Sequence, residues 1–113
     1  AGSAGANLGA GNYVENAIGS IAQGTAFDVM VLTGASYATV ALAEDQVAAR
    51  MTSATKGYVI FADSDDSTAK MYYDENLAAD NNLTSTATVL TFNGVANHSA
   101  IGAFFGITDF DLV

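Results

Sequence analysis

The chain contains no cysteine, proline or tryptophan, and only one of its 113 residues is histidine. Without cysteine, it has neither disulfide bonds nor thiolate ligands for a metal ion. Zinc sites are also disfavoured, because they draw on histidine when thiolates are missing. If such a chain works outside the cell, packing, bound ions or neighbouring molecules must stabilise it in place of disulfides, and a cytosolic protein could equally lack cysteine.

Basic residues are also scarce. Twelve acidic residues face only Arg50, Lys56 and Lys70, so the net charge is −9. Such a chain repels nucleic acid and anionic membranes and attracts metal cations. We therefore expect no nucleic-acid partner. No apolar run reaches the roughly 18 residues of a membrane-spanning helix, so we expect no membrane insertion.

The residues needed for catalysis are largely missing. His98 lies in a predicted loop, Asn97-His98-Ser99, with no carboxylate nearby in sequence to orient it as a base. No glycine-rich phosphate loop stands between a strand and a helix. Acidic residues are abundant, but abundance alone does not indicate a catalytic carboxylate pair. We predict that the chain is not an enzyme.

The first 24 residues differ in composition from the rest. They contain six glycines and one charged residue, Glu15. A Gly/Ala-rich segment buries too little surface to order itself, so we expect residues 1–24 to be a flexible or partner-docking arm before a domain at 25–113. Four embedded apolar residues suit docking on a neighbouring subunit by completing its sheet. These self-assembly candidates are Tyr13, Val14, Ile18 and Ile21. The arm also lacks the basic start and apolar core of a signal peptide, so either a leader has been removed or export uses a C-terminal signal.

Residues 25–56 predict one strand and one helix. Residues 25–33 are β-branched and almost continuously apolar between Gly24 and Gly34, which predicts a buried central strand. Apolar residues then recur at helical spacing, which predicts an amphipathic helix over about 40–52. These residues are Val40, Ala43, Val47 and Met51. Such a stripe is typical of a helix that covers a sheet.

The second half reads as short strands separated by turns. Residues 58–61, 69–73 and 84–92 have strand character, and the side chains of 69–73 are expected to alternate between two faces. Asn93-Gly94 is a turn signal. A short helical turn at 99–105 precedes a last strand at 107–113. The predicted fold is mainly β: a single antiparallel β-rich domain, sandwich or roll-like, with one short amphipathic helix.

The order of these segments supports a resemblance. An apolar strand, an acidic turn, an x-Tyr-Tyr-Asp strand, a polar loop, a Thr/Val/Leu strand and a terminal Asp-Phe-x-Leu-Val follow one another. This order resembles the C-terminal module of RTX-type (hemolysin-type calcium-binding) bacterial proteins exported by type I secretion. The resemblance covers about half of the chain and implies an extracellular or cell-surface location. It also implies a C-terminal secretion signal at Asp109, Phe110, Asp111, Leu112 and Val113.

Calcium is the ion that the composition favours, because it takes several hard oxygen ligands from loop carboxylates. Two acidic turns supply candidate ligands. These are Asp63, Asp65 and Asp66 in the first turn, and Asp74, Glu75 and Asp80 in the second. The alternative is that both turns are simply solvated. The glycine-rich calcium nonapeptide of the RTX proteins occurs nowhere in the chain, so its parallel β-roll is not expected.

The sequence favours a non-catalytic extracellular structural module that self-assembles, as a filament, surface-layer or matrix subunit. The alternative is a calcium-dependent C-terminal cap and secretion module of a larger RTX-type protein. Filaments or sheets of the purified chain would favour the first hypothesis, and a monodisperse monomer the second.

Overall fold

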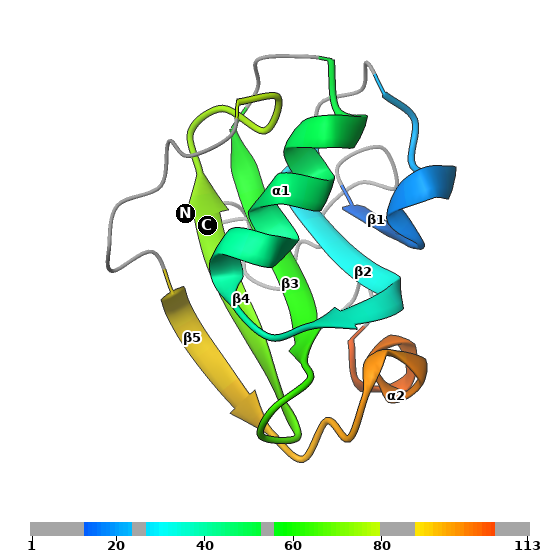
Figure 1. The fold of residues 1–113 in the computed structure, drawn as a ribbon. Helices are drawn as coiled ribbons and strands as arrows, with labels where there is room; N and C mark the ends of the chain where they lie inside the picture. Colours follow the sequence, from blue (N-terminus) through cyan, green and yellow to red (C-terminus); the bar gives the residue numbers. More distant parts are fainter. Residues whose placement is uncertain (1–12, 24–26, 53–55, 80–87, 106–113) are drawn as a thin grey trace, which may run out of the picture.

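In the computed structural model, which describes residues 13–23, 27–52, 56–79 and 88–105, five strands form one mixed sheet (Figure 1). The strands lie in the sheet in sequence order. They are β1 (Tyr13–Asn16), β2 (Val29–Tyr37), β3 (Gly57–Asp63), β4 (Thr68–Asp74) and β5 (Thr88–Asn93). A short 3-10 turn, η1 (Ile18–Ser20), follows β1, and two helices, α1 (Val40–Arg50) and α2 (His98–Phe104), complete the described elements. No helix of the described residues is long and apolar enough to cross a membrane.

The direction of the strands changes across the sheet. β1, β2 and β3 run parallel, whereas β4 and β5 are each antiparallel to the strand before them. The prediction of a single, mainly β domain with a short amphipathic helix is confirmed, but the sheet is mixed rather than antiparallel. The reason is that α1 returns the chain from the end of β2 to the opposite end of the sheet, so β3 starts at the same end as β2 and the two strands run parallel.

Helix α1 begins and ends close to the predicted limits of 40–52. Thr39 caps its start, because its side-chain oxygen accepts a hydrogen bond from the backbone N–H of Leu42 at 3.2 Å. At the other end, the Arg50 guanidinium donates to the carbonyl oxygen of Ile21 at 2.8 Å. This bond ties the end of the helix to the segment that follows η1.

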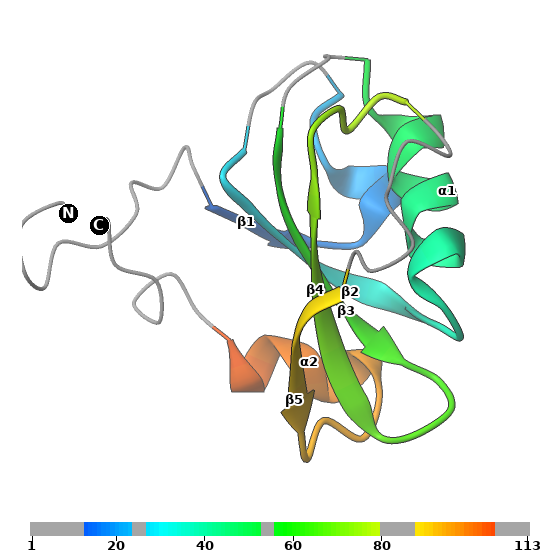
Figure 2. The same ribbon diagram turned by 90° about the vertical axis from the view of Figure 1, so that its left-hand side faces the viewer.

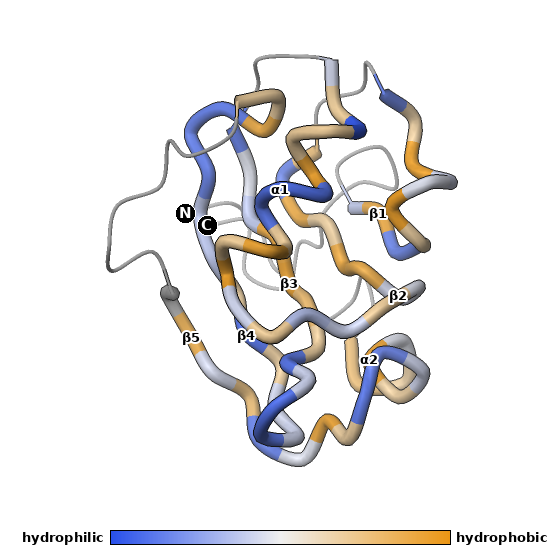
Figure 3. Tube along the Cα trace, viewed as in Figure 1, coloured by the Kyte–Doolittle hydropathy of each residue, from blue (hydrophilic) through white to orange (hydrophobic). Residues whose placement is uncertain are grey.

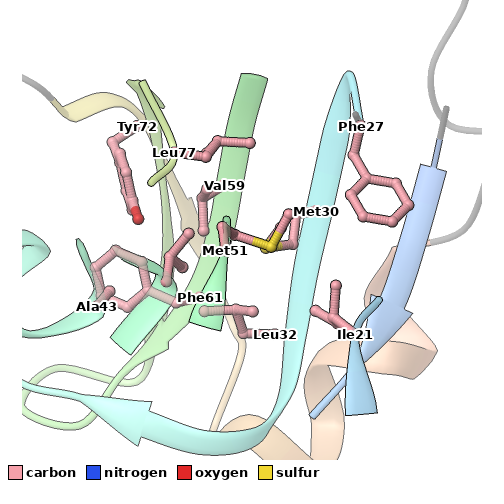
Figure 4. Packing of buried hydrophobic residues seen from close by; sticks show 11 residues of the cluster. Ile21, Phe27, Met30, Leu32, Ala43, Met51, Val59, Phe61, Tyr72 and Leu77 are labelled. Carbon is pink, nitrogen blue, oxygen red and sulfur yellow. The ribbon is translucent and has the colours of Figure 1, made fainter. Parts of the chain in front are cut away.

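The sheet separates two cores, because α1 and α2 lie on opposite faces (Figure 2). The α1-side core, shown in Figure 4, contains Ile21, Phe27, Met30, Leu32, Ala43, Val47, Met51, Val59, Phe61, Tyr72 and Leu77. The α2-side core contains Val29, Val31, Ile60, Ala62, Ala69, Val95, Ile101 and Phe105.

Strands β2 and β3 supply both cores, since alternate side chains point to opposite faces. Residues 29–32 of β2 and 59–62 of β3 are buried on both faces, which explains the continuous apolar run that identified β2 and the hydrophobic colour along these strands in Figure 3. The buried strand is thus confirmed, although it spans Val29–Tyr37 rather than 25–33. In β4, the expected alternation also holds, because Ala69 and Met71 pack on the α2 side and Tyr72 on the α1 side.

The N-terminal residues belong to the fold. β1 pairs with β2, Ile21 is only 1% exposed, and Val14 and Ile18 pack against the α1-side core. The expected boundary at residue 24 therefore falls inside the domain, and the structure differs here from the prediction. The reason is that these apolar side chains bury their surface against the chain's own sheet. Residues 1–12 lie outside the described part of the chain.

The connection from β5 to α2 is the turn expected at Asn93-Gly94. Gly94 has a φ of +85°, a left-handed conformation that glycine adopts without steric cost. Asn97 then caps α2, since its side-chain oxygen accepts from the backbone N–H groups of Ser99 and Ala100. The helical turn predicted at 99–105 is confirmed as α2.

Candidate assembly surface

The first acidic turn, between β3 and β4, is organised around a lysine. Asp63 is 2% exposed and forms an ion pair with the Lys70 ammonium, which also lies 3.4 Å from Asp66. The bond to Asp63 raises the pKa of Lys70 above its ordinary value. The pKa of Asp66 is lowered, first by the hydrogen bond from Thr68 and then by Lys70. Lysine therefore occupies the position between the two carboxylates that a cation would take.

Asp65 belongs to the same turn and is held there through its backbone. Its backbone N–H donates to Asp63 at 2.8 Å, and the residue itself is exposed. The structure thus brings Asp63 and Asp66 together, and holds Asp65 beside them through its backbone.

The second acidic turn follows β4. Asp74 is fully buried and accepts a hydrogen bond from the backbone N–H of Asn76 at 2.9 Å, whereas Glu75 is exposed. Asp80 lies outside the described residues. Within the part of the chain that is described, no three His, Cys, Asp or Glu residues gather as a group of metal ligands. Calcium binding remains a prediction.

His98 is the first residue of α2 rather than part of a loop. Its Nδ1 lies 3.0 Å from the Ser36 hydroxyl oxygen, and its backbone N–H donates to the same oxygen at 3.1 Å. The serine oxygen is thus used to anchor the start of α2 to β2. These contacts hold α2 against β2. They also place Ser36 next to the only histidine of the chain, but Ser36 is part-buried and is not an exposed nucleophile.

Of the described elements, α2 is the helix that covers the second face of the sheet, and it has only seven residues and lies against one end of that face (Figure 2). Beyond the helix, a row of neighbouring residues crosses four strands: Tyr13 beside Val29, Val29 beside Tyr58, and Tyr58 beside Tyr73. Val29 belongs to the α2-side core, so its neighbours in the row face the same way. The rings of Tyr58 and Tyr73 are in contact, with centroids 5.0 Å apart.

Strand β5 and helix α2 extend this surface with apolar side chains. Leu90 is 50% exposed and lies beside Met71, and Phe104 is 45% exposed. Phe92 fills the space between β5 and the helix, with its ring centroid 4.8 Å from that of Phe105. We call the resulting surface the open face. It consists of Tyr13, Tyr58, Met71, Tyr73, Leu90 and Phe104.

Charge is distributed unevenly around this surface. Residues 83–108 contain no Asp, Glu, Lys or Arg, although the whole chain carries −9. Strand β5 and helix α2 fall within this uncharged stretch. The open face was not predicted from the sequence, and the long gap between charges was a signal only for the part of it that β5 and α2 supply.

The expected self-assembly residues have different positions. Tyr13 contributes to the open face, and its hydroxyl donates to Glu15 at 2.9 Å. Val14, Ile18 and Ile21 instead pack in or against the α1-side core. The expected secretion signal at residues 109–113 lies outside the described residues.

No family model, curated protein or solved structure matches this chain. The resemblance to the RTX-type C-terminal module therefore stays a prediction, and the function is argued from the open face.

Proposed function

We propose that this chain is a non-catalytic structural module that works outside the cell and assembles with copies of itself into a filament, surface layer or matrix. The observation that carries the proposal is the open face, where the exposed side chains of Tyr58, Leu90 and Phe104 lie on one surface with three half-buried apolar side chains. On a soluble monomer, a contiguous apolar patch of this kind usually marks an interaction surface.

The physical argument combines burial with charge. Fully burying one leucine side chain contributes about 1.5–3 kcal/mol, so removing Leu90, Phe104 and the tyrosines from water favours association. Two copies that each carry −9 repel one another at most orientations. The uncharged surface of β5 and α2 is where this repulsion opposes contact least.

The test is sedimentation velocity of the purified chain over a wide concentration range. We expect larger species to grow with concentration in the wild type and to be lost in Leu90→Lys. Leu42→Lys is the matched control, because Leu42 is 48% exposed on α1, against 50% for Leu90, and the charge change is the same.

The two outcomes lead to different functions. Equal loss of assembly in both variants would show that assembly does not depend on the open face. A monodisperse wild-type monomer at every concentration would overturn the structural module. It would favour instead the calcium-dependent cap of a larger protein, for which the three aspartates of the β3–β4 turn are the relevant feature.

A further inference from the structure

We propose that a second copy of this chain pairs with the outer edge of β5, antiparallel to it and related by a two-fold axis, so that the two sheets become continuous. This inference rests on the proposed self-assembly and specifies the contact that begins it.

Among the described strands, β5 is an edge strand, and its sequence lacks the usual protection against pairing. It is the last strand in the sheet order, and its outer side has no strand neighbour among the described residues (Figure 1). Natural edge strands are usually prevented from pairing with other chains by lysine, proline, inward-pointing charges or very short length. β5 has six residues, TVLTFN, with no charge and no proline.

The opposite edge of the sheet is different. β1 has only four residues, and Glu15 lies in the middle of them. The carboxylate of Glu15 is exposed, and a second copy paired there would bring two like charges close together. The structure therefore offers one edge that can accept a second copy at low cost and one that resists it.

The side chains of β5 favour the same partner. A two-fold axis through an antiparallel strand pair places the same surface of both copies side by side, which closes the contact at a dimer. Leu90 projects from β5 onto the open face, so two such faces would join across the axis. Because β5 is uncharged, no like charges are opposed across the new strand pair.

The missing cysteine makes this contact directly testable, since one introduced thiol is the only one in the molecule. In an antiparallel pair, directly opposed Cα atoms are about 4.5–5.5 Å apart, within the range that a disulfide spans. We would introduce Leu90→Cys and Thr91→Cys separately in the full chain, because the axis can pass nearest to either residue. Asn16→Cys, exposed on the β1 edge, is the control.

We expect mild oxidation to give a covalent dimer with at least one β5 variant and not with Asn16→Cys. In the unmodified chain, amide hydrogen exchange within β5 should slow as protein concentration rises. Assembly with neither the cross-link nor this concentration-dependent protection would overturn the β5 contact and leave self-assembly standing. A monomer at all concentrations would overturn both.

One further outcome distinguishes a second copy at the β5 edge from a different occupant of that edge. If β5 is covered by the chain's own residues 106–113, its amides will be protected in the monomer at every concentration, and deleting those residues will remove the protection. That result would overturn the proposal.

Discussion

Tyr72 is the residue whose environment is most costly. It projects from β4 into the α1-side core, where its ring packs edge-on against Phe61 with centroids 6.2 Å apart. Its hydroxyl is buried and has no hydrogen-bond partner among the described residues. Burial raises the pKa of Tyr72 well above its ordinary value, and the negative charges of Asp74 and Glu44 add to the shift. The core gains the volume of an aromatic ring and bears an unsatisfied polar atom.

Replacing Tyr72 with Phe tests this balance. Because the ring stays and the unpaired hydroxyl goes, we expect the free energy of unfolding to rise by about 1 kcal/mol at neutral pH. Above pH 10, the unfolded tyrosine ionises while the folded one stays neutral, so the wild type loses stability as pH rises. The variant should lose less. Tyr37, whose pKa is also raised by burial, will keep part of the slope.

Urea unfolding at neutral and alkaline pH measures both effects. Tyr58→Phe is the control, since it removes a hydroxyl from the surface. If Tyr72→Phe is less stable than the wild type at neutral pH, the hydroxyl has a partner that the described residues do not include.

At the level of elements, the β3–β4 hairpin depends on Lys70. Asp63 ends β3 in a buried position, and Lys70 lies across the hairpin beside it. Removing one partner of a buried pair leaves the other charge uncompensated. We expect Lys70→Met to lower the free energy of unfolding by about 2–3 kcal/mol, reduced from the fully buried case because Lys70 is 23% exposed. Lys56→Met, at an exposed site, should have little effect.

Lys70→Met also tests the predicted calcium site in the β3–β4 turn. With the ammonium gone, Asp63, Asp65 and Asp66 present carboxylates without a bound cation. Millimolar calcium should then raise the melting temperature of Lys70→Met more than that of the wild type, because binding to the folded state alone stabilises it. Equal melting temperatures of Lys70→Met in calcium and in chelator, at matched ionic strength, would remove this turn from the calcium hypothesis.

Elements with a local signal could be predicted from the sequence. α1 follows from its helical spacing and β4 from its alternation, since both periods are properties of neighbouring residues. The parallel pairing of β1 with β2 could not be predicted, because strand pairing depends on residues distant in the sequence. The glycines around Tyr13 and Ile21 suggested a loose arm, but composition does not reveal that an edge of the sheet is available to order such a segment.

At the scale of the whole molecule, the candidate site was predicted less well than the fold. The acidic turns were predicted as a calcium site because clustered charged residues are easily recognised in a sequence. Burial of Asp63 and its pairing with Lys70 arise only from the strand register, in which Asp63 stands opposite Thr68. The open face differs from the acidic turns, because its residues carry no charge. It collects residues from β1, β3, β4, β5 and α2, so no single segment of the sequence carries its pattern.

The net charge of −9 leads to a prediction about assembly as a whole. If copies meet through the uncharged β5 and open face, long-range repulsion is the main electrostatic term and salt should weaken it. The screening length falls from about 30 Å at 0.01 M salt to about 3 Å at 1 M. We therefore expect the dissociation constant, measured by sedimentation equilibrium in sodium chloride, to fall at least roughly tenfold over this range. Leu42→Lys should follow the wild type, and Leu90→Lys should stay monomeric throughout. Dissociation as salt increases would mean that ion pairs hold the copies together, which would place the contact on the charged part of the surface and away from β5.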